Sequence, residues 1–161
     1  MKKVFFYESP VGLLGIAEDD GFITQVFFAK DKNCPGFEIA ETPLIKKTMS
    51  QLKEYFASKR KVFDLSLNPK GTDFQRSVWK ALVAIPFGET RTYQEIAVQA
   101  GNPKACRAVG MSNNRNPIVI IIPCHRVIGK DKSLTGYGGG LDNKKFLLEL
   151  EGSSTVWNIN K

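Results

Sequence analysis

The residues best suited to chemistry lie in the run Pro123-Cys124-His125-Arg126-Val127, which places a cysteine beside the only histidine of the 161-residue chain. A free thiol has a pKa of ~8.5, so only a few per cent is ionised at neutral pH, and a nucleophilic cysteine usually relies on a base within hydrogen-bond reach. His125 can be that base. The run therefore predicts nucleophilic chemistry at Cys124.

Glu151 is the candidate third member of this group, because its position breaks two local rules. It falls in the last turn of a predicted C-terminal helix, where the negative end of the helix dipole disfavours a carboxylate. It also follows Leu147 by four residues, which turns it toward the apolar side of that helix. The ordinary alternative is a surface glutamate at a frayed helix end. If Glu151 meets His125, the three residues form a nucleophile, a base and an acid that orients the base.

Cysteine usage and net charge limit the class of protein. Three cysteines, without C-x-x-C spacing, indicate no disulfide framework, and with one histidine they provide no zinc motif. We therefore expect no metal and no cofactor. The formal net charge of +7 favours a polyanionic partner, although many basic proteins bind no nucleic acid. No apolar run reaches the ~20 residues of a membrane-spanning helix, so we expect a cytoplasmic protein in a reducing compartment, with no membrane partner.

Residues 1–67 are predicted to form an α/β N-terminal domain, a small antiparallel sheet with a helix. Short apolar runs separated by turn signals are typical of hairpin strands, and they lie at 4–7, 13–17 and 22–28. Thr42 and Pro43 begin a helix with apolar residues at helical spacing. Alternating apolar residues indicate one more strand, at Phe63, Leu65 and Leu67. Nothing in this domain proposes chemistry.

Residues 68–152 are predicted to form a second, mainly α-helical domain, followed by a tail at 153–161. Thr72 or Asp73 begins its first helix and Pro86 ends it, because proline removes a backbone donor and clashes with the preceding turn.

Two short helices joined by a tight turn at Gly101 then indicate a helix-turn-helix, for which the alternative is an ordinary pair of packed helices. Thr92 caps the first helix, and Asn102-Pro103 are predicted to cap and start the second. Small side chains along the second helix allow either close helix packing or approach to a nucleic-acid backbone. Lys104 and Arg107 supply positive charge there.

The segment that presents Cys124 follows. The apolar run 118–122 is typical of a fully buried strand, and it would deliver Cys124 at its end. Asp142 is predicted to cap the last helix, whose buried side carries Phe146, Leu147 and Leu150.

These motifs, taken in order, resemble the O6-alkylguanine-DNA alkyltransferase family, also called methylated-DNA–protein-cysteine methyltransferases. The resemblance runs from about Phe74 to Gly152, roughly half of the chain. The matching segments are Gly101-Asn102-Pro103-Lys104, Arg107-Ala108-Val109-Gly110, Asn116-Pro117, the run around Cys124, and Gly136-Tyr137 with the glycines that follow. The resemblance implies an α/β N-terminal domain and a DNA-binding domain whose winged-helix-like helix-turn-helix approaches the minor groove.

The resemblance also implies the reaction. O6-alkylguanine in double-stranded DNA is flipped out of the stack, and its alkyl group passes to Cys124 in one irreversible turnover. His125 generates the thiolate through a water, and Glu151 orients His125. O4-alkylthymine is a second candidate substrate. The protein would act as a monomer.

Further site residues are carried over by position. Arg107 would fill the space left by the flipped base, and Tyr93 would rotate the neighbouring phosphate and protonate the leaving guanine. Asn116 would brace the link between recognition helix and active site. The remaining candidates for contact with DNA or the base are Lys104, Arg126, Val127 and Gly138. Gly138 stands where some relatives have serine, so only a backbone donor remains.

Two other functions stay open from the residues alone. Some relatives keep the DNA-binding architecture without the reactive cysteine and only sense alkyl lesions. Cysteine, histidine and acid also serve in hydrolases, although no oxyanion element follows the adjacent Cys124 and His125.

Overall fold

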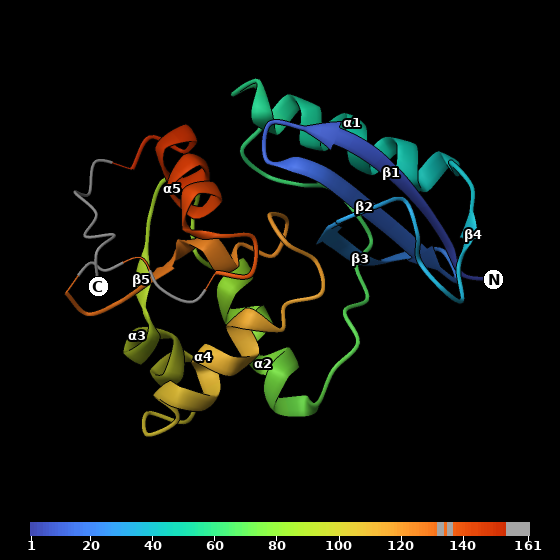
Figure 1. Cartoon of the computed structure of the whole chain (residues 1–161). Coiled ribbons are helices and arrows are strands. Elements are labelled where there is room, and N and C mark those ends of the chain that lie inside the picture. The colour runs from blue at the N-terminus through green and yellow to red at the C-terminus, as the bar shows by residue number, and fades with distance from the viewer. Residues whose placement is uncertain (132–133, 135–136, 154–161) are drawn as a thin grey trace. The chain divides into compact units, whose positions relative to one another are not determined.

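The structure, a computed structural model, describes residues 1–131, 134 and 137–153 (Figure 1). Gly136 of the glycine-rich motif lies outside these described residues, as does the predicted tail after its first residue. By its internal contacts the chain divides into two units. The first unit joins Met1–Lys70 to Pro117–Val119, and the second joins Gly71–Asn116 to the chain from Ile120 onward.

Three antiparallel strands form the sheet of the first unit, as predicted, and a short parallel strand extends it. In the order β3-β2-β1-β4 along the sheet, the strands are Phe22–Phe28, Gly12–Asp19, Lys3–Ser9 and Glu38–Ile39. In the β2–β3 turn, both Asp20 and Gly21 have positive φ, 53° and 81°, which suits a two-residue hairpin turn. Strand β4, which pairs in parallel with β1, was not predicted.

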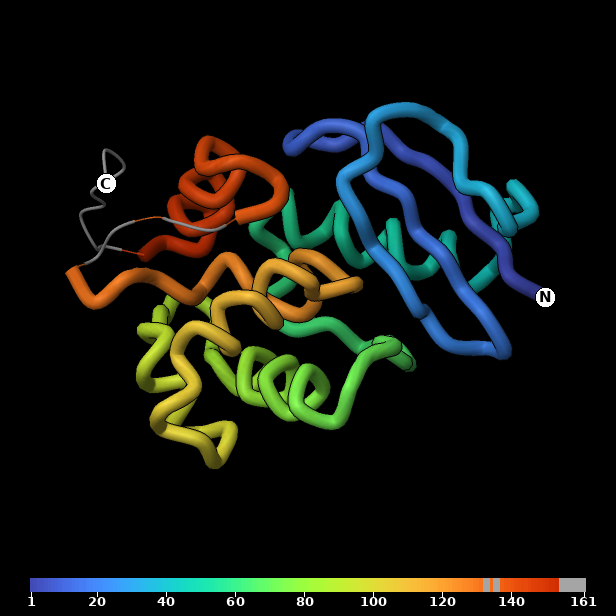
Figure 2. The backbone as a smooth tube through the Cα atoms, turned by 60° about the horizontal axis from the view of Figure 1, so that its bottom comes forward, coloured from blue at the N-terminus to red at the C-terminus, as the bar shows by residue number. Residues whose placement is uncertain are grey.

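Helix α1 Pro43–Phe56 covers one face of this sheet (Figure 2). It begins as predicted, because the Thr42 hydroxyl accepts a hydrogen bond from the Ile45 amide at 3.1 Å and Pro43 occupies the first turn. Since side chains alternate along a strand, the other sheet face carries a separate apolar cluster. Its members are Val4, Phe6 and Ala17, with Leu13, Phe27, Ala29, Cys34 and Phe37 packed against them.

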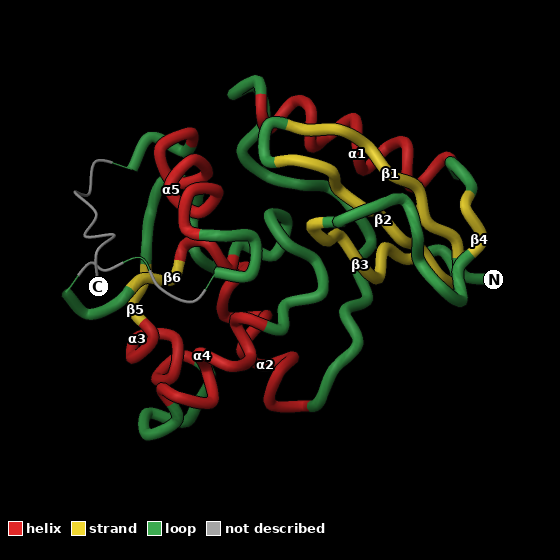
Figure 3. The backbone as a smooth tube through the Cα atoms, viewed as in Figure 1, coloured by secondary structure: helices red, strands yellow, loops and turns green. Residues whose placement is uncertain are grey.

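The strand predicted at Phe63, Leu65 and Leu67 is wrong. Only Leu67 makes a bridge, to Ile23, and the segment is otherwise a loop (Figure 3). The outer edge of β3 does not accept a full strand here, because residues 117–119 take the next pairing position along it, at Val26.

Helices dominate the second unit, as predicted. They are α2 Asp73–Val83, α3 Tyr93–Gln99, α4 Cys106–Asn114 and α5 Leu141–Leu150. Two-residue strands β5 Arg91–Thr92 and β6 Val127–Ile128 pair in parallel. Thr72 and Thr92 cap α2 and α3 in reciprocal capping boxes, with Gln75 and Glu95 as the returning side chains. No helix in the described part of the chain is long and apolar enough to cross a membrane.

The second helix of the predicted helix-turn-helix starts later than predicted. It begins at Cys106, and Asn102-Pro103 do not cap or start it. The preceding residues form a turn, in which the Ala105 amide donates to the Asn102 carbonyl at 3.0 Å. The Gln94 side chain of α3 donates to the Pro103 carbonyl at 3.0 Å and so holds this turn against α3.

The buried strand predicted at 118–122 is also wrong. Ile118 makes a single bridge, and the residues after it turn, with Ile120 at a φ of 71° (Figure 3). All five positions except Val119 are buried. The apolar run therefore predicted burial correctly, but burial alone does not distinguish a strand from a buried turn.

The last helix differs in its cap and its buried face. Gly140 is the N-cap residue, and Asp142 lies in the first turn, where its charge favours the positive end of the helix dipole. Phe146 is 38% exposed, whereas Leu147, Leu148 and Lys144 are buried. The buried face is therefore rotated from the predicted one.

Candidate active site

Cys124 lies in a tight turn rather than at a strand end. Residues Cys124–Arg126 form one turn of 3-10 helix, and the chain continues directly into β6, which pairs with β5. Cys124, His125 and Arg126 are 3%, 0% and 6% exposed. The turn is therefore held inside the second unit.

Two asparagines at the end of α4 support this turn. The Asn113 side chain donates to the Cys124 carbonyl at 3.3 Å, and the Asn116 side chain donates to the Ile122 carbonyl at 2.7 Å. Both asparagines are buried, and such side chains are costly to bury unless they are hydrogen-bonded. They tie the helix that carries Arg107 to the backbone on either side of Pro123.

Glu151 meets His125, as the sequence predicted. His125 Nε2 and Glu151 Oε2 are 2.7 Å apart, and both side chains are fully buried. Arg126 approaches the same carboxylate with two nitrogens, Nε at 2.7 Å and Nη2 at 3.0 Å. Its third nitrogen, Nη1, donates to the Ile85 carbonyl at 2.7 Å. One carboxylate thus orients both residues that follow Cys124.

The charges of this group are set by its burial and its partners. Burial alone would raise the pKa of Glu151, but His125 and Arg126 outweigh that effect and lower the pKa to about 2. Burial lowers the pKa of His125, against the opposing effect of Glu151. We therefore assign a carboxylate, a guanidinium and a neutral imidazole whose Nε2–H donates to Glu151. His125 Nδ1 has no hydrogen-bond partner within the described residues.

Burial keeps Cys124 protonated at neutral pH, so a base is needed to form the predicted thiolate. Burial raises the pKa of the thiol to about 11, although a hydrogen bond with the Asn116 side chain and the charge of Lys144 both lower it. His125 lowers the pKa of the thiol through a hydrogen bond of its backbone.

Lys144 is a functional candidate that sequence reasoning missed. This α5 side chain is fully buried, and burial lowers its pKa to about 8, opposed by the negative charge that Cys124 can carry. A signal was present, because Lys144, Leu147, Leu148 and Glu151 follow the three-, four- and seven-residue spacing of one helix face.

Arg126 does not occupy the position predicted for a DNA-binding residue. All three of its guanidinium nitrogens have partners inside the second unit, and the side chain also lies over the Phe87 ring, 5.8 Å from its centroid. A buried, fully paired guanidinium cannot reach a phosphate without breaking the Glu151 ion pair. Arg126 therefore positions Glu151.

The remaining predicted site residues divide by exposure. Val127 is buried in β6, whereas Arg107 on α4, Lys104 before it and Gly138 are exposed. Tyr93 is half-buried as the first residue of α3, and a Cβ added to Gly110 of α4 would contact its ring at 3.9 Å. Tyr93 is therefore placed where α3 and α4 pack.

Comparison with protein families covers nearly the whole chain. Residues 3–69 match the model described as 6-O-methylguanine DNA methyltransferase, ribonuclease-like domain. Residues 73–153 match the model described as 6-O-methylguanine DNA methyltransferase, DNA binding domain.

Individual proteins of known name are also similar to this chain. The methylated-DNA–protein-cysteine methyltransferase of Methanosarcina acetivorans is 53% identical over 150 residues, which are 91% of this chain and 96% of that protein. The constitutive enzyme of the same name from Bacillus subtilis is 48% identical over 151 residues, 89% of this chain and 92% of the relative. The crystal structure of Mycobacterium tuberculosis OGT in complex with DNA superposes with a TM-score of 0.86 at 46% identity, covering 92% of both chains.

Proposed function

The chain belongs to the 6-O-methylguanine DNA methyltransferase family, and on this premise we propose that it repairs DNA by moving the alkyl group of O6-alkylguanine irreversibly onto Cys124. The observation that carries the proposal is the buried 2.7 Å contact between His125 and Glu151 beside a buried cysteine. O4-alkylthymine is a second candidate substrate.

The proton leaves Cys124 by way of His125. Glu151 fixes the proton of the imidazole on Nε2, which leaves Nδ1 as an acceptor toward a bridging water and the thiol. The imidazolium that forms is stabilised by the carboxylate, as in other nucleophile–base–acid groups. Because the resting thiol is protonated, the nucleophile forms only during the reaction.

The thiolate then attacks the saturated carbon on guanine O6. The sulfur–carbon bond forms as the carbon–oxygen bond breaks, and the guanine takes a proton from Tyr93. The positive charge of Lys144 favours the thiolate over the thiol. The product is a thioether, and expelling an alkyl thiolate from saturated carbon would require a second nucleophile. Each molecule therefore acts once.

The exposed surface of α3 and α4 is the proposed DNA contact. We place α4 in the minor groove, with Arg107 in the space left by the flipped base and Lys104 near the backbone. The α3–α4 pair, joined at Gly101 beside the β5–β6 ribbon, supports a winged-helix-like arrangement. Asn116 couples α4 to the active-site turn, while Val127 and Gly138 offer backbone groups to the base.

We assign all residues that take part in the reaction to the domain predicted at 68–152. Residues 1–67 contribute no catalytic group. We propose that the protein acts as a monomer in the cytoplasm. Its three free cysteines support a reducing compartment.

Loss of the lesion from DNA tests the proposal. Duplex DNA with one O6-methylguanine is mixed with increasing protein, and the remaining modified base is quantified by chromatography after hydrolysis. We expect one lesion repaired per protein molecule, no repair by Cys124→Ala and full repair by the matched Cys106→Ala variant. Binding of the lesion by wild-type protein without its loss would instead establish a lesion-sensing module.

A further inference from the structure

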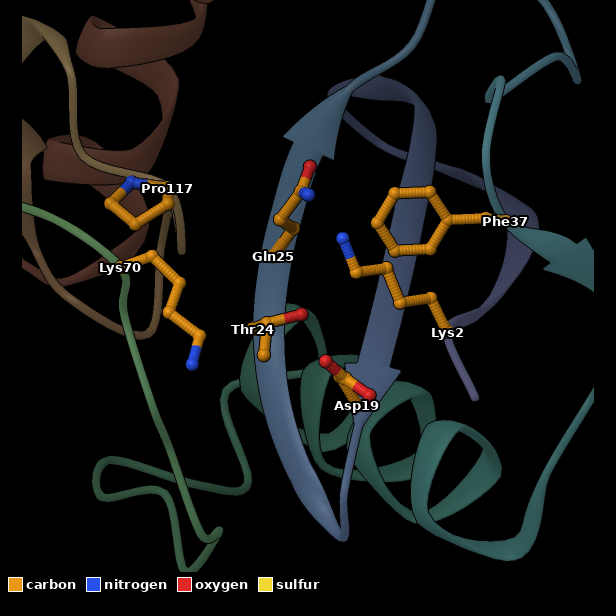
Figure 4. A pocket seen from close by; sticks show the side chains of 7 residues that line it. All are labelled: Lys2, Asp19, Thr24, Gln25, Phe37, Lys70 and Pro117. Carbon is orange, nitrogen blue, oxygen red and sulfur yellow. The ribbon is translucent and has the colours of Figure 1, made fainter.

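The first unit contains a hollow of about 220 Å³ that has no part in the proposed reaction. It lies on the sheet face opposite α1, where Thr24 and Gln25 of β3 form its floor (Figure 4). The side chains of Lys2 and Lys70 extend toward these two residues from either side of the strand, and the Phe37 ring stands beside Lys2.

An irregularity in β3 explains why two consecutive residues share this face. Ala17 pairs with Gln25 but Glu18 pairs with Ile23, so Thr24 is an extra residue without a partner on β2. Such a β-bulge turns neighbouring side chains to the same side, and bulges are frequent beside functional sites. Ile23 and Val26, on either side, remain fully buried in the core.

The chain segments that flank the bulge complete the hollow. Ile23 bonds to the backbone of Ser66 and Asn68, each at 2.9 Å, and the chain then reaches Lys70. Val26 bonds to Pro117, also at 2.9 Å, and Pro117 forms another part of the wall. Residues distant in the sequence are thus fixed around Thr24 and Gln25 by backbone hydrogen bonds.

The two polar side chains on the floor of the hollow have no hydrogen-bond partner among the described residues. Thr24 is 6% exposed, yet neither its hydroxyl nor the Gln25 amide makes a side-chain hydrogen bond within the part of the chain that the structure describes. The Thr24 hydroxyl is not among the buried side-chain atoms without a partner, so it is open to the hollow and can bond to a molecule there. The two side chains therefore offer hydrogen bonds to a molecule bound in the hollow.

The charge of the hollow favours an anion. Lys2 lies over the Phe37 ring, 5.6 Å from its centroid, and Lys70 has no ion pair among the described residues. The one carboxylate of the wall, Asp19, is 3.8 Å from the N-terminal amine, which offsets its charge. Two ammonium groups thus face the neutral donors Thr24 and Gln25.

We propose that this hollow binds a small molecule that carries a phosphate group. The phosphate lies between Lys2 and Lys70 and accepts hydrogen bonds from the Thr24 hydroxyl and the Gln25 amide. Phe37 and Pro117 contact the group attached to the phosphate. At about 220 Å³ the hollow is smaller than the pockets of about 300 to 1,000 Å³ that enclose a drug-sized ligand, so it takes the phosphate and only part of the group attached to it. It therefore suits a small phosphate ester better than a duplex, whose phosphates lie on a wide, rigid surface.

Titration of the full chain tests this site independently of alkyl transfer. Backbone amide spectra are recorded with inorganic phosphate, with deoxyguanosine monophosphate and with undamaged duplex DNA, all at constant ionic strength. We expect saturable shifts at Thr24 and Gln25 with the two small phosphates. Lys70→Gln and Thr24→Val should each weaken binding by about five- to tenfold. Lys47→Gln, which removes an exposed lysine of α1, is the matched control and should change nothing.

Two results would overturn the site. One is the absence of saturable shifts with either small phosphate, including the case in which only duplex DNA perturbs these amides. The other is equal weakening by Lys70→Gln and Lys47→Gln, which would show screening of net charge rather than a site. Thermal unfolding of each variant ensures that lost binding does not come from lost fold, and Thr24→Val keeps a β-branched residue for the same reason.

Discussion

Two regions of the second unit differ in exposure and in the pairing of their charges. They are the turn at Cys124–Arg126 and the outer surface of α3 and α4. In the turn, the residues are at most 6% exposed, and the charges of Arg126 and Glu151 are paired. On the surface, Lys104 and Arg107 are exposed and have no ion-pair partner among the described residues. The groups proposed for chemistry are therefore fixed before DNA binds, whereas the proposed DNA contacts are exposed and available to bind it.

Removing the base should have the largest effect. His125→Gln keeps a polar side chain but cannot take the Cys124 proton, so we expect single-turnover transfer to slow by about 10²- to 10⁴-fold. Affinity for lesion-bearing DNA should be nearly unchanged, because His125 is fully buried. Rapid-quench kinetics and DNA titration check the two quantities, and a rate within threefold of wild type would remove His125 from the mechanism.

Glu151→Gln should weaken both chemistry and stability. It leaves Arg126 buried without a counter-charge, which costs about 3 to 5 kcal/mol in comparable ion pairs. It also loses the acid that supports the imidazolium, so transfer should slow by at least about tenfold. Denaturant unfolding and transfer kinetics measure these effects. If both stay at wild-type values, the ion pair has no role in either.

The pH dependence of the free energy of unfolding measures the contribution of the Glu151 carboxylate by itself. Its pKa is lowered from 4.5 to about 2 in the folded protein, so the stabilisation is complete above pH 4.5 and is lost as the pH falls toward 2. The shift corresponds to about 3 kcal/mol. Unfolding free energies measured between pH 6 and pH 2 should fall more steeply for wild type than for Glu151→Gln. Parallel curves would place the acid sensitivity elsewhere.

Lys144→Met removes one buried charge and keeps a long apolar side chain. We expect transfer to slow by about tenfold, because the pKa of Cys124 rises further without the nearby ammonium. In wild type, the rise of the rate with pH should flatten above about 8, where Lys144 loses its proton, and the variant should lack this flattening. A pH profile of the same shape in both proteins would show that Lys144 only fills space.

Arg107→Ala, on the exposed surface, should have the smallest and most selective effect. Transfer from a lesion in duplex DNA should slow by a few fold to about tenfold, whereas reaction with free O6-alkylguanine base should be unchanged, because no base leaves a stack. Lys59→Ala, an exposed lysine of the first unit, serves as a charge control. Equal losses on duplex and free base would contradict a role in base flipping.

The sequence predicted elements best where a local rule applied. Caps at Thr42, Thr72 and Thr92 are confirmed, since a capping side chain needs only nearby backbone amides. The same rule gave the wrong residue at Asn102 and Asp142, where Ala105 and Gly140 are the N-cap residues. The expectations for Leu67, Ile118–Ile122 and Pro103 failed. The segments at Leu67 and Ile118–Ile122 depended on pairing with β3, which is distant in the sequence, and the turn at Pro103 is held by the Gln94 side chain. Composition and spacing encode neither contact.

The same distinction holds for the site. Glu151 could be found because a carboxylate at a helix end, facing inward, breaks local rules, and its contact with His125 is confirmed. Lys144 also faces inward, but it stands beside Lys145 in a polar stretch, where it looks like an exposed residue. Arg126 was assigned to DNA, because nothing in its neighbours shows that Glu151 and Ile85 would enclose it.

The central claim is that Cys124 becomes the alkylated residue. Peptide mass spectrometry after mixing the protein with duplex DNA that carries one O6-methylguanine tests it directly. The account predicts one added methyl group on the peptide containing Cys124, none on those containing Cys34 or Cys106, and unmodified guanine in the DNA. An unmodified Cys124 accompanied by lost lesion, or a methyl group on another residue, would contradict it.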